Sequence, residues 1–176
     1  MGNKIDLSKY SVVLLSAGIG RRMGKLGKIT PKSLLKINSE QTLISRIINL
    51  LKKRKAKKIN IIVGYKSRLI KRYLKKIENL DFKFIKIKNF KSNGHAYSWY
   101  SFKNEWFKNM KPLLILHTDI LFSPQYLDNI LNSKKKNIIG VKWRKNHKFK
   151  KNSYIVKSDK NSKILSIDKF KNNKNF

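Results

Sequence analysis

The chain has 176 residues, of which 43 are Lys or Arg and 9 are Asp or Glu, so its formal net charge is +34. This length fits one domain, and 40% hydrophobic residues are enough for a buried core. The absence of cysteine excludes disulfides and thiolate metal sites. The longest apolar run near the start, Val12 to Leu15, is too short for a signal sequence or a membrane span, so we expect a cytoplasmic protein without a transmembrane segment.

The excess of positive charge would attract anionic partners, and nucleic acid is the first class to consider. The cations run through nearly every segment instead of forming one stripe, and Asn and Ile are abundant too, which is typical of a coding bias toward A and T. No RRM, KH or zinc motif is visible. We therefore expect no specific nucleic-acid partner, while a basic RNA-binding protein stays open as an alternative.

Short apolar runs alternate along the chain with stretches of helical period, a pattern typical of a mostly parallel α/β sheet. Strands are predicted at Ser11–Leu15, Ile59–Val63, Phe82–Ile87, Leu113–His117 and Ile138–Val141. Helices are predicted at Leu43–Leu51, at Leu69–Ile77, over Tyr97–Trp106, and from Ser123-Pro124 through Leu131. In the last of these, Ser123 would cap the helix and Pro124 would take the first helical position.

The sequence becomes polar and basic after Val141, and Lys142–Lys151 is predicted to be a loop. Beyond it, Tyr154–Val156 and Ile164–Ile167 flank the turn signal Asp159–Ser162, which predicts a hairpin of two strands. The Asn- and Lys-rich segment Lys171–Phe176 is expected to be a frayed tail.

The first predicted strand runs directly into a glycine turn, Leu15-Ser16-Ala17-Gly18-Ile19-Gly20-Arg21-Arg22-Met23-Gly24, and a Pro31-Lys32 pair follows. Glycines let backbone N–H groups approach a phosphate closely. The spacing fits neither the Rossmann fingerprint nor the Walker P-loop. It fits Leu-(Ala/Ser)-Ala-Gly-x-Gly-x-Arg-(Met/Leu) with a downstream Pro-Lys, and on these residues the chain resembles the nucleotidyltransferase superfamily. A glycine-rich turn beside a solvated basic loop is the structural alternative.

The resemblance implies a three-layer, Rossmann-like α/β fold, in which a mostly parallel sheet carries helices on both faces and a β-hairpin follows at the C-terminus. We expect a single domain over residues 1–176. Within it, residues 10–141 would form the nucleotide-binding core, residues 142–170 would begin the acceptor-binding part, and residues 171–176 would be the tail.

Nucleotidyl transfer to a phosphomonoester needs positioning and cancellation of negative charge more than acid–base catalysis. By resemblance, Arg22 would hold the triphosphate and Lys32 would neutralise the reacting phosphates, and these two are the expected catalytic residues. A role as ordinary surface cations is the alternative for both. The residues expected to bind the nucleotide are Leu15, Ser16, Ala17, Gly18, Gly20, Arg22, Asn93, Gly94 and Ser98. For the segment at Asn93 and Ser98, helix N-capping competes with base recognition.

Magnesium is the usual third source of positive charge in this chemistry, and it prefers oxygen ligands. Asp119 lies just after the predicted strand Leu113–His117, at the end of the sheet where open α/β folds bind ligands. The segment resembles the family's Gly-Asp-x-x-Phe, with Thr118 where glycine is common. Asp119 is therefore the expected Mg²⁺ ligand, and helix capping is the alternative. His117 is expected to be packed or hydrogen-bonded and not a ligand.

The pair Asp168-Lys169 resembles a family segment that ends in Glu-Lys and contacts the acceptor, so both residues are expected to bind the acceptor. The shorter aspartate reaches less far, and a solvated strand end is the alternative. The Gly64-Tyr65 turn also matches the family, and for both of its residues we favour a structural role.

The resemblance implies a Mg²⁺-dependent nucleotidyltransferase that uses a nucleoside triphosphate and a small phosphorylated acceptor. The Gly64-Tyr65 turn and the polar start of the helix near Tyr97 favour CTP, with an acceptor such as phosphocholine, a phosphonate or a sugar phosphate. Members of the family continue well past the acid–lysine pair, so the later part of the family domain has no counterpart here. A degenerate nucleotide-binding module without turnover is thus an alternative, and a homo-oligomer that completes the site is compatible with the sequence.

Overall fold

The computed structural model describes residues 5–88, 90, 95–134, 137–140 and 154–169. They divide into two compact units, residues 1–132 and residues 133–176. Among the described residues, no helix has both the length and the apolar character needed to cross a bilayer.

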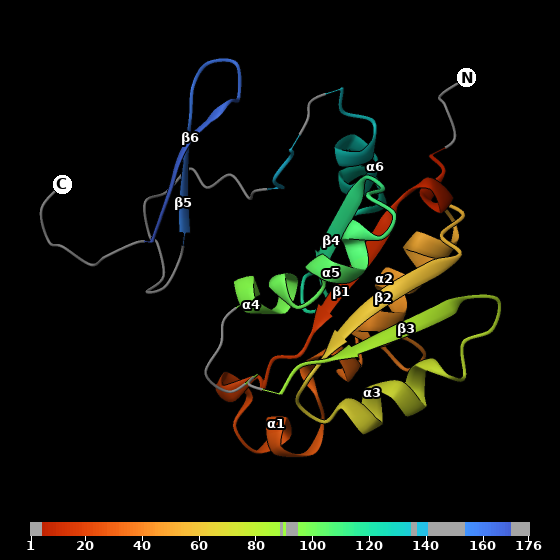
Figure 1. Cartoon of the computed structure of the whole chain (residues 1–176). Helices are drawn as coiled ribbons and strands as arrows, with labels where there is room; N and C mark the ends of the chain where they lie inside the picture. Colours follow the sequence, from red (N-terminus) through yellow and green to blue (C-terminus); the bar gives the residue numbers. More distant parts are fainter. Residues whose placement is uncertain (1–4, 89, 91–94, 135–136, 141–153, 170–176) are drawn as a thin grey trace, which may run out of the picture. The chain divides into compact units, whose positions relative to one another are not determined.

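The first unit is built on a parallel sheet in the order β3-β2-β1-β4 (Figure 1). Its strands are β1 (Ser11–Ser16), β2 (Lys58–Val63), β3 (Asp81–Lys86) and β4 (Leu113–His117). Leu14 of β1 pairs with Ile61 on one side and with Leu116 on the other. The chain therefore turns from one side of β1 to the other between β3 and β4, and all four strands end at the same edge of the sheet.

Helices cover both faces of this sheet. Because successive side chains of a strand point to opposite faces, Val12 and Leu14 belong to one core and Val13 and Leu15 to another. The larger core is closed by α2 (Leu43–Lys52), α3 (Ser67–Leu74) and α6 (Pro124–Leu131). The smaller core is closed by α4 (His95–Tyr100) and α5 (Lys103–Phe107) around Phe102. This arrangement confirms the predicted three-layer, Rossmann-like fold.

The caps of α2 and α6 explain where these two helices begin. Thr42 and Ser45 form a capping box, in which each side chain accepts a hydrogen bond from the other residue's backbone N–H. Ser123 caps α6 by accepting from the Tyr126 N–H, as the sequence predicts. Beyond α2, Arg54 binds both carboxylate oxygens of Asp128 at 2.6 and 2.8 Å, which fixes α6 against the rest of the unit.

The helix predicted over Tyr97–Trp106 is instead two short helices, α4 and α5. The Ser101 hydroxyl donates to the Tyr97 carbonyl, and the Phe102 N–H donates to Trp99, three residues back. A hydroxyl that bonds back to the backbone and a tightened last turn both interrupt the regular α-helical pattern. The interruption turns the Phe102 side chain, 1% exposed, into the smaller core.

The strand predicted at Ile138–Val141 is wrong for residues 138–140, which the structure describes as non-strand, and Val141 lies outside the described residues. Ile138 and Ile139 are 40% and 50% exposed. An apolar run becomes a strand only when a neighbouring strand satisfies its backbone, and composition alone cannot supply that neighbour.

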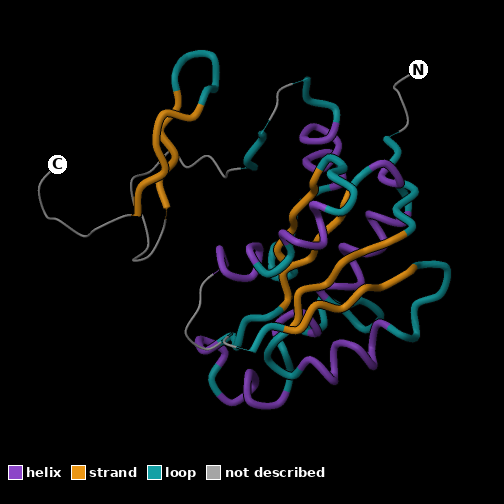
Figure 2. Tube along the Cα trace, viewed as in Figure 1, coloured by secondary structure: helices purple, strands orange, loops and turns teal. Residues whose placement is uncertain are grey.

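The second unit contains the predicted hairpin, β5 (Tyr154–Ser158) and β6 (Ile164–Lys169), which pair antiparallel (Figure 2). Its turn is closed by Asp159, whose carboxylate accepts hydrogen bonds from the N–H groups of Asn161 and Lys163. The predicted loop at residues 142–151 and the predicted tail at 171–176 lie outside the described residues. Four short elements complete the described part of the chain: the helix α1 (Lys25–Ile29), the 3-10 turns Leu7–Lys9 and Arg21–Met23, and η3, the 3-10 turn Lys32–Leu34.

Candidate active site

A cavity of about 350 Å³ opens at the carboxyl ends of β1 and β4. These two strands are neighbours in the sheet, and the strand order reverses between them. Helices that follow strands on either side of such a reversal turn away from each other, which leaves a crevice where open α/β sheets bind their ligands. The cavity is lined by Leu15, Ser16, Ala17, Gly18, Gly20, Arg21, Arg22, Met23, Pro31, Lys32, Ser33, Ile87, Phe90, Ser98, His117, Thr118 and Asp119.

The glycine turn after β1 forms one wall of the cavity. Gly20 has a φ of 69°, a left-handed conformation that glycine adopts without strain. At Gly18, an added Cβ would meet no atom of the protein within 4 Å. The missing side chain at Gly18 therefore leaves open space above the backbone, as required if a phosphate is to approach the peptide N–H groups.

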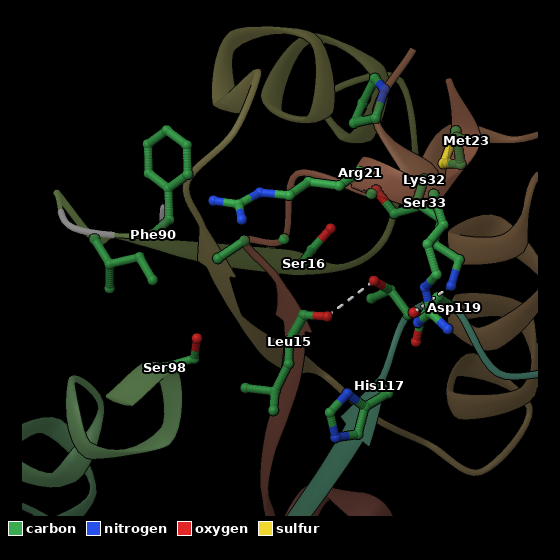
Figure 3. Close-up of a pocket in the computed structure, with 17 residues that line it drawn as sticks. Leu15, Ser16, Arg21, Met23, Lys32, Ser33, Phe90, Ser98, His117 and Asp119 are labelled. Atoms are coloured by element: carbon green, nitrogen blue, oxygen red, sulfur yellow. Dashed lines mark hydrogen bonds and ion pairs between the residues drawn. The ribbon is translucent and has the colours of Figure 1, made fainter. Parts of the chain in front are cut away.

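Lys32 and Asp119 lie side by side at one end of the cavity and form an ion pair with an Nζ to Oδ2 distance of 2.7 Å (Figure 3). Both side chains are about a third exposed, at 37% and 34%. Burial alone would raise the pKa of the Asp119 carboxyl, but the hydrogen bond and charge of Lys32, with a contribution from His117, hold that pKa below its usual value. Asp119 is therefore ionised at neutral pH.

Asp119 is positioned by its neighbour Thr118. The Thr118 hydroxyl and N–H both donate to the Leu15 carbonyl, at 2.9 and 3.3 Å, and the side chain is buried. These two bonds continue the pairing of β4 with β1 one residue beyond the strand. The backbone of Asp119 is thereby held beside the glycine turn.

Two adjacent arginines, Arg21 and Arg22, line the cavity. Figure 3 shows the Arg21 side chain extending away from Lys32 and over Ser16 toward Phe90. Arg21 was missed at the sequence level because it occupies a variable position of the motif. The cavity thus holds three cationic side chains and, among the lining residues that the structure describes, one carboxylate.

The end of the cavity far from Lys32 carries the Phe90 ring and the buried residue Ser98, and the Arg21 side chain extends toward it (Figure 3). Gly64 packs closely against Phe90, because an added Cβ at Gly64 would lie 2.7 Å from the Phe90 Cβ and 2.9 Å from the Ala17 carbonyl oxygen. Tyr65 donates its N–H to Ala17 and its hydroxyl to Gly27. These contacts support the structural role predicted for Gly64 and Tyr65.

The donor set around Asp119 is compatible with Mg²⁺, which prefers oxygen and often takes one or two carboxylates together with substrate phosphates. Among the described residues, no group of three or more His, Cys, Asp or Glu side chains could enclose a metal ion. A Mg²⁺ ion at Asp119 would therefore depend on phosphate oxygens and water for its other ligands.

A comparison of the sequence with protein families identifies the family. The model of the family described as nucleotidyl transferase matches residues 11–170. The chain belongs to the nucleotidyl transferase family.

Two solved structures share the fold of this chain. A CTP:phosphocholine cytidylyltransferase from Streptococcus pneumoniae is 21% identical, with a TM-score of 0.63 over 91% of this chain and 64% of its own. The inositol-1-phosphate CTP transferase from T. maritima is 15% identical, with a TM-score of 0.68 over 98% of this chain and 67% of its own. This chain therefore spans about two thirds of the length of these two structures.

A curated relative, the 2-aminoethylphosphonate cytidylyltransferase of Lancefieldella rimae, is 37% identical over 60 residues. That match covers 34% of this chain and 24% of the relative. The similarity at the sequence level is thus confined to a short part of both proteins.

Most of the site residues expected from the nucleotidyl transferase motif come together at the cavity: Leu15, Ser16, Ala17, Gly18, Gly20, Arg22, Lys32, Ser98 and Asp119. Asn93 and Gly94 lie outside the described residues. Asp168 and Lys169 lie in β6 of the second unit, where the Asp168 carboxylate accepts a hydrogen bond from Ser166. The roles of all these residues remain predictions.

Proposed function

We propose that this chain transfers a nucleotidyl group, CMP from CTP, to a small phosphomonoester or phosphonate and releases pyrophosphate. The observation that carries the proposal is the ion pair of Lys32 and Asp119 beside the glycine turn, in a cavity at the reversal of the strand order. A cation, a carboxylate and an exposed backbone at one point are what a triphosphate with its metal requires.

The polarity of the cavity supports one orientation of the nucleotide. Lys32 and Asp119 lie at one end, and Phe90 and Ser98 lie at the other (Figure 3). The triphosphate would occupy the charged end, while the base would lie against Phe90 with the Ser98 hydroxyl within its reach. An aromatic ring offers a stacking surface to any base, so the choice of base would depend on polar groups.

In the reaction, an oxygen of the acceptor phosphate or phosphonate would attack the α-phosphorus of the nucleotide. The bond between the α-phosphorus and the bridging oxygen to the β-phosphate would break, and pyrophosphate would leave with the electron pair. Arg22 and Lys32 would hold the phosphates and neutralise the charge that develops on them. Asp119 would hold Mg²⁺, which when bound supplies further positive charge to the phosphate oxygens. Asp168 and Lys169 would bind the acceptor.

CTP and a phosphonate or phosphocholine-type acceptor are favoured by the similar proteins, three of which are named as cytidylyltransferases or CTP transferases. Their names extend to this chain only as candidate substrates. The proposal also includes a soluble cytoplasmic location, Mg²⁺ dependence and a single functional domain.

The test is pyrophosphate release with each of four nucleoside triphosphates and Mg²⁺, in the presence of phosphocholine, 2-aminoethylphosphonate, inositol 1-phosphate or glucose 1-phosphate. We expect release with CTP and one of these acceptors, and a loss of at least about 10²-fold in Lys32→Ala and in Asp119→Ala. The matched control variants Lys76→Ala and Glu40→Ala change exposed charges that do not line the cavity, and they should retain activity.

Triphosphate binding without product from any acceptor would indicate a degenerate nucleotide-binding module. Binding of RNA that is indifferent to Arg22→Ala, without binding of any triphosphate, would favour the basic RNA-binding alternative. Equal activity of Lys32→Ala and Lys76→Ala would contradict the role proposed for the cavity.

A further inference from the structure

Lys32 and Asp119 are 87 positions apart in the sequence, yet each is the direct partner of the other in the folded protein. At 2.7 Å, the ammonium group and the carboxylate share a charge-assisted hydrogen bond. Both residues line the cavity. The cation expected to bind phosphate is thus already neutralised by the carboxylate expected to bind a metal ion.

The two partners differ in how firmly they are held. Asp119 follows Thr118, whose two hydrogen bonds to Leu15 fix the backbone at the end of β4. Lys32 lies in η3 after Pro31, so its backbone is fixed too, but four rotatable bonds separate the ammonium group from that backbone. The Lys32 ammonium group can therefore leave the Asp119 carboxylate by rotation of the lysine side chain, without any change in the backbone fold.

We infer that Asp119 masks Lys32 in the ligand-free protein, so that Lys32 becomes available to a polyphosphate only when a divalent cation takes over Asp119. This inference rests on the proposed function and concerns the same cavity. It makes Asp119 a residue that couples cation binding to phosphate binding, in addition to a metal ligand.

Without a divalent cation, Asp119 should oppose the binding of a polyphosphate in the cavity. A polyphosphate that enters the cavity alone must either displace Asp119 from Lys32 or bind without Lys32, and it meets the negative charge of Asp119 in both cases. Lys32 should then contribute little to the affinity. Once the charge of Asp119 is removed, Lys32 is released from this ion pair and should contribute fully.

Simple repulsion between Asp119 and the phosphates makes a different prediction. In that case, removal of the Asp119 charge strengthens binding by the same factor whether or not Lys32 is present, because the two side chains act independently. Masking predicts that the effects of the two substitutions depend on each other, which a double-mutant cycle measures directly.

The experiment uses the full chain and four proteins: the unsubstituted protein, Lys32→Gln, Asp119→Asn and the double variant. Titration calorimetry measures their affinity for CTP and, separately, for inorganic tripolyphosphate, both in EDTA. We expect Lys32→Gln to weaken binding by less than about twofold when Asp119 is present. In the Asp119→Asn background, the same substitution should weaken binding by about tenfold. This difference is a coupling free energy within the range found for residues in contact. Asp119→Asn alone should tighten binding by about tenfold.

Glu40→Gln and Lys76→Gln are matched controls, because they make the same charge changes at exposed residues that do not line the cavity. They correct for the effect of net charge on the binding of any anion. Thermal unfolding of each variant confirms that the titrated protein is folded.

The inference would be overturned if Lys32→Gln changed the affinity by the same factor in both backgrounds. It would also be overturned if Asp119→Asn failed to tighten the binding of CTP and of tripolyphosphate in EDTA. The proposed function fails separately, if the unsubstituted protein binds no nucleoside triphosphate even with Mg²⁺. In that event, the tripolyphosphate titrations still decide whether Asp119 masks Lys32.

Discussion

The two faces of the sheet differ in how they are covered. On one face, α2, α3 and α6, of 8 to 10 residues each, close over a large core that includes Ile61. On the other face, α4 and α5, of 6 and 5 residues, close over a smaller core that includes Ile62. Several members of the smaller core, among them Leu15 and Ala17, also line the cavity. Alternate residues of each strand serve different faces, so both faces contribute to stability, but the smaller core also forms part of the cavity wall.

The largest effects are expected from truncating Ile61 and Ile62, neighbours on β2 that are both fully buried and that point to opposite faces of the sheet. Ile61→Ala and Ile62→Ala should each lower the free energy of unfolding by about 2–5 kcal/mol, because each leaves a cavity in a packed core. Chemical denaturation measures this loss. Only Ile62→Ala should also weaken the binding of CTP with Mg²⁺, measured below the unfolding transition, since its cluster contains Leu15 and Ala17. An equal loss of affinity in both variants would show that the faces are not independent.

A second test compares Gly64 with Gly18. Gly64→Ala should lower the free energy of unfolding by about 1–3 kcal/mol, since its Cβ would collide with Phe90 and with the Ala17 carbonyl. Gly18→Ala meets no protein atom and should stay within about 0.5 kcal/mol of the unsubstituted protein. It should nevertheless weaken CTP binding by about tenfold, because the new methyl group would occupy space needed by the phosphates. Unchanged affinity in Gly18→Ala would place the triphosphate elsewhere.

The smallest expected effect belongs to the cap of α2. Thr42→Ala removes the hydroxyl that accepts from the Ser45 N–H and should lower the free energy of unfolding by about 1 kcal/mol. Because Thr42 and the residues of α2 do not line the cavity, the affinity for CTP with Mg²⁺ should not change. Thermal unfolding measures the loss of stability, and titration calorimetry on the same sample measures the affinity. Ser98→Ala is the contrasting variant, because Ser98 lines the cavity and its substitution should alter the affinity for CTP.

Much of the architecture could be predicted from local patterns. The runs of Val, Ile and Leu before Ser16 and before Thr118 predicted β1 and β4, and the helical periodicity around Ile47 predicted α2. Local patterns failed at Phe102, where the turn between α4 and α5 depends on packing against the sheet, and at Ile138, where no neighbouring strand is available among the described residues.

Sequence patterns likewise identified some residues of the site and missed others. Gly18, Lys32 and Asp119 could be found because each lies in a recognisable segment. Arg21 and Phe90 could not, because one occupies a variable position of the motif and the other lies between segments without a pattern. A single aromatic or basic residue has no periodic pattern around it, so only the tertiary structure can show that it lines a cavity.

By itself, the sequence determined the order of strands and helices, the glycine turn, and the residue types that could bind phosphate and metal, because these depend on backbone freedom, side-chain periodicity and charge within short segments. Only the tertiary structure decided that Lys32 and Asp119 pair directly and that Arg21 extends toward Phe90. The reason is that β1 and β4 become neighbours through the packing of the whole sheet, and a distance of 2.7 Å between residues 87 positions apart is set by that packing and by no local preference.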